Sequence, residues 1–291
     1  MGFNPDYLKK IDFNRAARDR YGWNFYAIKE GDHAYHWKST NGSARYGLDL
    51  SDAAIRQAGN GFVPVMIGGK AEDWRFLNFA QLNFKVIPVV LTTIDYIWDH
   101  NQIKTRVDNL KSYLVAGQEW LRQQIDRTFD MIQPIVYYSP NLTKARLDEW
   151  NRLMSEPNNP KRWDYFYGIR DEVKFLLGNN YNESTHKYWT FVLGGNNGSS
   201  TISPVAVTHS DVFNNRYDQF EYIQHTKRGD EADNVYASLH ELLHSFGLDH
   251  PSPTQPNYEK SIMMTRRVSS NQDCILLDNE KQILLSSPFL N

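Results

Sequence analysis

The chain has 291 residues, a length that suits one large domain or two modest ones with a sizeable core. Its formal net charge of −2 and the lack of a long basic run exclude nucleic acid and an anionic membrane surface as expected partners. It contains no run of about eighteen apolar residues, so we expect no membrane span. The polar first ten residues lack the apolar segment of a signal peptide, and the sequence leaves the compartment and the oligomeric state unknown.

Residues 1–83 are the hardest part of the chain to interpret, and we treat them as an N-terminal extension that is an accessory domain or a pro-segment. Aromatic residues alternate loosely over 21–37, which suggests strands, and Asn41-Gly42 can form a hairpin turn. Residues 50–58 fit a short helix, and residues 62–67 fit a buried strand that ends at two glycines.

From residue 84 onwards the pattern becomes regular. Residues 85–94 form an apolar run typical of a strand that is buried on both faces. Residues 103–129 carry apolar side chains at helical spacing, and residues 132–138 fit a second strand. This order predicts a βαβ unit with two parallel strands and a right-handed crossover.

Two helices and two strands are expected next. Thr143 is a suitable N-cap for a helix that reaches about residue 154, and residues 171–177 fit a short helix. Residues 188–193 and residues 202–207 fit two further strands.

The following segment has the features of an amphipathic helix. Asp230 and Asp233 are candidate N-cap residues, and Glu231 suits the positive end of a helix dipole. Apolar residues at helical spacing then predict a face that packs into the core: Val235, Leu239, Leu242, Leu243 and Phe246.

Three histidines and a glutamate in this helix, and in the turn after it, form the main candidate site. His240 and His244 are four residues apart, so both imidazoles can reach one ion from the same face of the helix. Glu241 lies between them in angle and can take a proton from water without being a ligand. Gly247 can adopt the left-handed conformation that turns the chain back, which brings His250 to the same ion. Three neutral nitrogen ligands with a fourth position left for water are typical of a catalytic zinc site.

This arrangement, His-Glu-x-x-His-x-x-Gly-x-x-His, resembles the zinc-binding consensus of the metzincin clan of metalloendopeptidases. The clan also has a methionine-containing turn below the metal, the Met-turn, and Met263 in Ser-Ile-Met is similar to its usual form, with Met264 as the alternative. The resemblance covers about residues 84–291. It implies an α+β, metzincin-like peptidase domain with a mixed twisted sheet, long helices and an active-site helix, and it suggests secretion.

The resemblance also implies an activity and a partner. The chain would be a zinc-dependent endopeptidase of an extended protein or peptide, with one catalytic Zn²⁺ on the three histidines and Glu241 as the general base. The clan binds its substrate along an edge strand, and this role would fall to residues 189–193 or 202–207.

Several residues between these strands and the helix are weaker candidates. His209 and His225 could stabilise a transition state or bind a second ion, although most such histidines are ordinary polar residues. Related enzymes often bind Ca²⁺, but the spacing of Asp211, Asp218 and Glu221 matches no calcium loop.

Two other functions fit the same motif. One is a non-proteolytic zinc-containing binding or adhesion protein, and the intact Glu241 counts against it. The other is a zinc hydrolase of a non-peptide amide, which a small closed pocket would favour, whereas a long open cleft would favour peptides.

Cys274 is the only cysteine, so no intramolecular disulfide is expected, and no cysteine precedes the motif to cap the metal. Peptide specificity and latency do not follow from the sequence.

Overall fold

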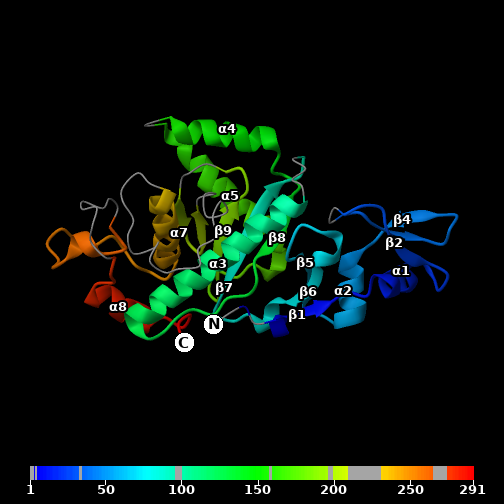
Figure 1. Ribbon diagram of the computed structural model, residues 1–291, viewed down its shortest axis with the longest axis horizontal. Coiled ribbons are helices and arrows are strands. Elements are labelled where there is room, and N and C mark those ends of the chain that lie inside the picture. The colour runs from blue at the N-terminus through cyan, green and yellow to red at the C-terminus, as the bar shows by residue number, and fades with distance from the viewer. Residues whose placement is uncertain are drawn as a thin grey trace.

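The computed structural model describes residues 3, 5–32, 35–95, 100–156, 159–195, 199–208, 231–264 and 274–291. An eight-stranded mixed sheet forms its centre, in the order β1-β6-β5-β8-β7-β9-β11-β10 (Figure 1). The strands are β1 (Leu8–Lys10), β5 (Phe62–Met66), β6 (Trp74–Asn78), β7 (Lys85–Thr93), β8 (Ile135–Ser139), β9 (His186–Val192), β10 (Ser200–Ile202) and β11 (Val205–Thr208). The expected α+β class with a large mixed sheet is confirmed.

The middle of the sheet is parallel. Strands β8, β7, β9 and β11 run parallel to one another, whereas β5 is antiparallel to β8, and β10 is antiparallel to β11 and forms one edge. The helix α3 (His100–Ile125) joins β7 to β8, so the predicted parallel βαβ unit is confirmed. The apolar run of β7 is buried along almost its whole length, as a strand covered on both faces requires.

Helices cover both faces of the sheet. They are α3, α4 (Lys144–Ser155), α5 (Trp163–Leu177), α7 (Glu231–Ser245) and α8 (Asp278–Leu285). One core cluster joins α3, α7 and α8 to the face that carries Trp189, and a second joins α4 and α5 to the face that carries Tyr188. Because these two residues are adjacent in β9, their side chains point to opposite faces. The predicted N-cap of α4 is confirmed, since Thr143 accepts a hydrogen bond from the Arg146 N–H.

The residues before 84 extend the large sheet and also build a small one. Strands β1, β6 and β5 form the second edge of the large sheet. The small antiparallel sheet contains β2 (Tyr26–Lys29), β3 (Trp37–Thr40) and β4 (Arg45–Gly47), next to α1 (Phe13–Tyr21) and α2 (Leu50–Ala58) (Figure 1). The helix expected at 50–58 and the strand expected at 62–67 are confirmed. The domain boundary at 83 stays a prediction, although strands on both sides of it share one sheet.

Short 3₁₀ helices occupy several of the connections. They lie at Pro5–Tyr7, Ala71–Asp73, Phe79–Gln81, Pro160–Arg162, Gly178–Asn180 and Tyr258–Lys260. Among the described helices, none is both long enough and apolar enough to cross a membrane.

Two expected elements differ from the structure. The short helix expected at 171–177 is the last part of α5, which begins at Trp163. Gly168 obscured this helix, because glycine is a poor helix former, but a Cβ at this position would collide with the indole of Trp150. The strand expected at 202–207 is a hairpin, in which Ser203 and Pro204 form the turn between β10 and β11. Proline lacks the N–H that a continuous strand would need there.

Candidate metal centre

The helix α7 is anchored by the apolar face that its sequence predicted. Four of the five predicted residues, Leu239, Leu242, Leu243 and Phe246, are buried in the core cluster that contains Trp189, whereas the side chain of Val235 lies outside the described part of the structure. The indole Nε1–H of Trp189 in β9 donates a hydrogen bond of 3.0 Å to the Ser238 carbonyl, which joins the helix to the sheet. The predicted cap residue Asp230 lies outside the described residues, whereas Asp233 falls inside the helix rather than at its cap. The helix is therefore a rigid support for the histidines it carries.

Gly247 turns the chain back at the end of this helix, as predicted. Its φ is +100°, a conformation that favours glycine, and its N–H donates to the His244 carbonyl at 2.9 Å. No atom lies within 4 Å of an ideal Cβ built at this position. Glycine is therefore needed for its backbone conformation and not for lack of space. The turn brings His250 back to the face of the helix that carries His240.

The three predicted ligands converge on one point. Their Nε2 atoms are separated by 2.9 Å between His240 and His244, 3.1 Å between His244 and His250, and 3.3 Å between His250 and His240. A tetrahedral zinc ion with Zn–N distances of about 2.0–2.1 Å places its ligand nitrogens about 3.3–3.4 Å apart. The triangle of nitrogens thus fits one small metal ion with little adjustment. Within the described residues, this is the one cluster of histidine, cysteine or carboxylate groups close enough to hold an ion.

The tautomers of two histidines follow from their outer hydrogen bonds. The Nδ1 of His240 lies 2.7 Å from the Ile262 carbonyl oxygen, and the Nδ1 of His244 lies 2.6 Å from the Leu248 carbonyl oxygen. Because a carbonyl oxygen only accepts, each Nδ1 carries the hydrogen and each Nε2 carries the lone pair that can bind a metal. Burial lowers the pKa of His240 to about 3 and also lowers the pKa of His244. Both rings are thus neutral, as metal ligands must be.

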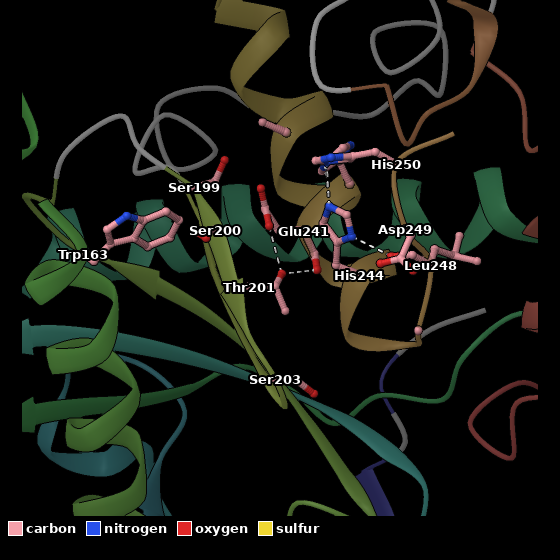
Figure 2. Close-up of a pocket in the computed structure, with 13 residues that line it drawn as sticks. Trp163, Ser199, Ser200, Thr201, Ser203, Glu241, His244, Leu248, Asp249 and His250 are labelled. Atoms are coloured by element: carbon pink, nitrogen blue, oxygen red, sulfur yellow. Dashed lines mark hydrogen bonds between the residues drawn. The ribbon is translucent and has the colours of Figure 1, made fainter. Parts of the chain in front are cut away.

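Glu241 lies beside this triangle and is held by a residue of the edge strand. The Thr201 hydroxyl in β10 is 2.9 Å from Glu241 Oε2 and 2.5 Å from the Glu241 carbonyl oxygen (Figure 2). Burial raises the pKa of Glu241 to about 7, and the hydrogen bond from Thr201 opposes this shift. A carboxyl group poised near neutrality can both accept and return a proton.

The loop after the third histidine supports the first one. Ser261 and Met263 are fully buried, and Met264 is half-buried. The Ser261 hydroxyl donates to Glu280 Oε1 of α8 at 2.5 Å and accepts a hydrogen bond of 2.9 Å from the Met263 N–H. Ile262, between them, supplies the carbonyl oxygen for His240. Met263 therefore lies in a fixed turn next to the histidines, and its role as the Met-turn residue stays a prediction.

A cavity of about 640 Å³ lies over these residues. Figure 2 shows that Glu241 and His244 face it from α7, whereas Ser200 and Thr201 of the edge strand, and Ser199 just before it, face it from the opposite side. Trp163, at the start of α5, lies on the other side of β10 from the histidines. The cavity thus spans the edge strand, from Trp163 on one side to the histidines on the other.

The order of the strands corrects both alternatives for the substrate-binding edge. Strand β9, which contains residues 189–192, lies between β7 and β11 and has no free edge. Within the described part of the chain the outermost strand is β10 at Ser200–Ile202, so the segment at 202–207 contributes only Ile202 to the edge.

Other candidate residues have different outcomes. His209, His225, Asp211, Asp218 and Glu221 lie outside the described residues, so a second ion or a calcium site there stays a prediction. Asp249, which lies next to His250 in the chain, was not among the candidates; it is exposed, and its charge partly opposes the burial that lowers the pKa of His244. Neither Thr201 nor Glu280 was predicted from the sequence. The only available signal was that Glu280 occupies the first turn of a helix, a usual place for an acidic residue.

Comparisons with known proteins do not assign the chain to a family. No family model and no curated protein matches the chain. Among solved structures, wild-type OgpA from Akkermansia muciniphila is similar over 71% of this chain and 62% of its own, with 10% identity and a TM-score of 0.45. Catalytically inactive OgpA in complex with an O-glycopeptide substrate, glycodrosocin, is similar over 72% and 61%, with 10% identity and a TM-score of 0.43. The chain thus spans less than two thirds of these neighbours, and scores this low do not establish a shared fold.

Proposed function

We propose that this protein is a zinc-dependent endopeptidase that hydrolyses peptide bonds of an extended polypeptide. The observation that carries the proposal is the convergence of three imidazole nitrogens, 2.9–3.3 Å apart, next to the carboxyl group of Glu241. Such a donor set suits zinc, and the three nitrogens leave one tetrahedral position for water or substrate.

Each residue of the site has a distinct part in this proposal. When bound, zinc lowers the pKa of water towards about 7 and polarises a carbonyl group. His240, His244 and His250 would hold the ion through Nε2, and the Ile262 and Leu248 carbonyls keep two of these rings in the required tautomer. Glu241 would accept a proton from the attacking water and deliver it to the leaving amine.

The edge strand supports a peptide as the substrate. The outer edge of β10 has no neighbouring strand among the described residues, so its backbone can pair with an extended peptide. This pairing needs little specific sequence, because it uses backbone hydrogen bonds. Since Thr201 of β10 contacts Glu241, a peptide paired with the strand would pass next to the base.

The test compares the metal content and the peptide cleavage of the wild type and Glu241→Gln. Glutamine keeps the size of the side chain but cannot accept the proton as a carboxylate does. We expect one zinc ion per chain in both proteins, and cleavage of a random peptide library by the wild type alone. Cleavage by Glu241→Gln at the wild-type rate would remove Glu241 as the base. A wild type that binds zinc and cleaves no peptide would favour the binding protein or the hydrolase of another amide.

A further inference from the structure

We propose that Thr201 is a positioning residue for Glu241, and that its hydroxyl fixes the carboxylate of the base against the edge strand. This inference rests on the proposed function. Its basis is a pair of contacts from one hydroxyl, to Glu241 Oε2 at 2.9 Å and to the Glu241 carbonyl oxygen at 2.5 Å. The two residues are 40 positions apart in the chain, so the contact depends on the tertiary fold.

The register of the hairpin explains why Thr201 is the residue that reaches α7. Thr201 pairs with Ala206, which packs in the core cluster that contains the α7 residue Leu239. Ser200 and Ile202 pair with Val207 and Val205, which belong to the cluster on the opposite face of the sheet. Because side chains alternate along a strand, Thr201 is the residue of β10 that points towards α7.

The contact with the helix backbone makes this hydroxyl a fixed point. The Thr201 hydroxyl has one hydrogen, which is shared between two acceptors of Glu241, Oε2 and the carbonyl oxygen of the rigid helix. A β-branched side chain in a strand also has few χ1 rotamers, so little entropy is lost when the hydroxyl is held. The second contact then restrains Oε2, and Oε1 is left as the atom that accepts the proton from water. Figure 2 shows the carboxyl group of Glu241 between β10 and the histidines, as this role requires.

One consequence links substrate binding to the base. The three-residue strand Ser200–Ile202 would position two groups. One is a substrate peptide that pairs with its backbone, and the other is the carboxylate of Glu241. Loss of the hydroxyl should therefore lower kcat much more than it changes KM or zinc binding, because the backbone edge and the histidines remain.

The experiment compares Thr201→Val with Thr201→Ser and a matched control. Valine has the shape of threonine without the hydroxyl, whereas serine keeps the hydroxyl. The control is Thr208→Val on the neighbouring strand β11, where the hydroxyl donates to the Thr190 carbonyl at 3.2 Å. With a peptide found in the library, we expect kcat to fall roughly 10- to 100-fold in Thr201→Val. KM and zinc content should stay near the wild-type values, and Thr201→Ser should regain most of the lost kcat.

Three results would overturn the inference: an unchanged kcat in Thr201→Val, an equal loss in Thr201→Ser, or an equal loss in Thr208→Val. A double-mutant cycle provides a readout that does not need activity. The denaturation midpoints of Thr201→Val, Glu241→Ala and the double variant should be non-additive, because the side-chain contact can be lost only once. Additive midpoints would contradict the contact even in a protein without peptidase activity, whereas a wild type that cleaves no peptide would contradict the proposed function alone.

Discussion

The Nδ1 of His240 lies 2.7 Å from the carbonyl oxygen of Ile262, so a turn 22 residues further along the chain fixes the tautomer of the first proposed ligand. The same turn is held by Ser261 and, through it, by Glu280 of α8. The site is therefore supported from three elements: α7, the turn at 261–264 and the C-terminal helix. This support explains why several residues that do not touch the metal position should nevertheless affect metal binding.

Zinc should stabilise the folded protein. A ligand that binds only the folded state adds about 2.7 kcal/mol at a free concentration of 100 times its Kd. We expect Tm to rise with zinc in the wild type and to stay constant in His244→Ala. This variant removes the nitrogen that lies nearest to the other two, at 2.9 and 3.1 Å. Calorimetry with and without zinc measures this. An equal rise in both proteins would place the stabilising ion elsewhere.

Gly247→Ala should weaken the site through the backbone alone. The φ of +100° is strained for alanine, at a cost of about 1–2 kcal/mol, although nothing lies within 4 Å of the new Cβ. If the turn relaxes, His250 moves away from the other two nitrogens, so zinc affinity should fall together with Tm. Chelator competition measures the affinity. Gly59→Ala, at another positive φ of +101° that ends α2, is the matched control and should lower Tm without changing zinc affinity.

Glu280→Ala should lower both stability and zinc affinity. The carboxyl group accepts hydrogen bonds from the Ser261 hydroxyl and the Leu277 N–H, and its removal leaves two buried donors without this partner. We expect the free energy of unfolding to fall by about 1–3 kcal/mol. Zinc affinity should fall roughly 10- to 100-fold, as is usual when a group that supports a metal ligand is removed.

The control for Glu280 is Glu172, a second buried glutamate that binds a buried serine hydroxyl, that of Ser139. Glu172 belongs to α5 on the other face of the sheet. Glu172→Ala should be destabilising but should leave zinc affinity unchanged. An equal loss of affinity in both variants would mean that Glu280 acts only through general stability.

His186 should make the protein sensitive to acid. Its ring is buried, and burial lowers its pKa from 6.5 to about 4. The unfolded chain therefore binds a proton between these pH values while the folded chain does not, so stability is full above pH 6.5 and falls as the pH drops towards about 4. His186→Gln cannot take up this proton and should lose less stability over the interval, as urea denaturation at several pH values would show. His36→Gln, at an exposed position, is the control and should follow the wild type. If the stability of the wild type and of His186→Gln changed with pH in parallel, the prediction would be contradicted.

The parts of the site that follow from local spacing could be predicted. His240, His244 and Glu241 lie on one helix, so their relation depends only on helical geometry, and Gly247 signalled the turn to His250 by its residue type. The parallel pair β7 and β8 was predictable for a similar reason, because a strand, a long helix and a second strand follow each other directly.

The remaining parts depend on contacts between distant segments. Thr201 and Glu241 are 40 residues apart, and Ser261 and Glu280 are 19 residues apart, so no periodicity links them. The start of α5 was hidden because Gly168, a poor helix former, is required there by its contact with Trp150. Local propensity alone could not show that contact.

The most direct test of the account is removal and return of the metal. Chelation of the wild type should abolish cleavage of a peptide selected from the library, and zinc added back should restore it fully at one equivalent per chain. The same titration of His250→Ala should restore little activity, because only two of the three convergent nitrogens remain. Cleavage that survives complete chelation, or that returns equally in His250→Ala, would contradict the proposal that these three histidines form a catalytic zinc site.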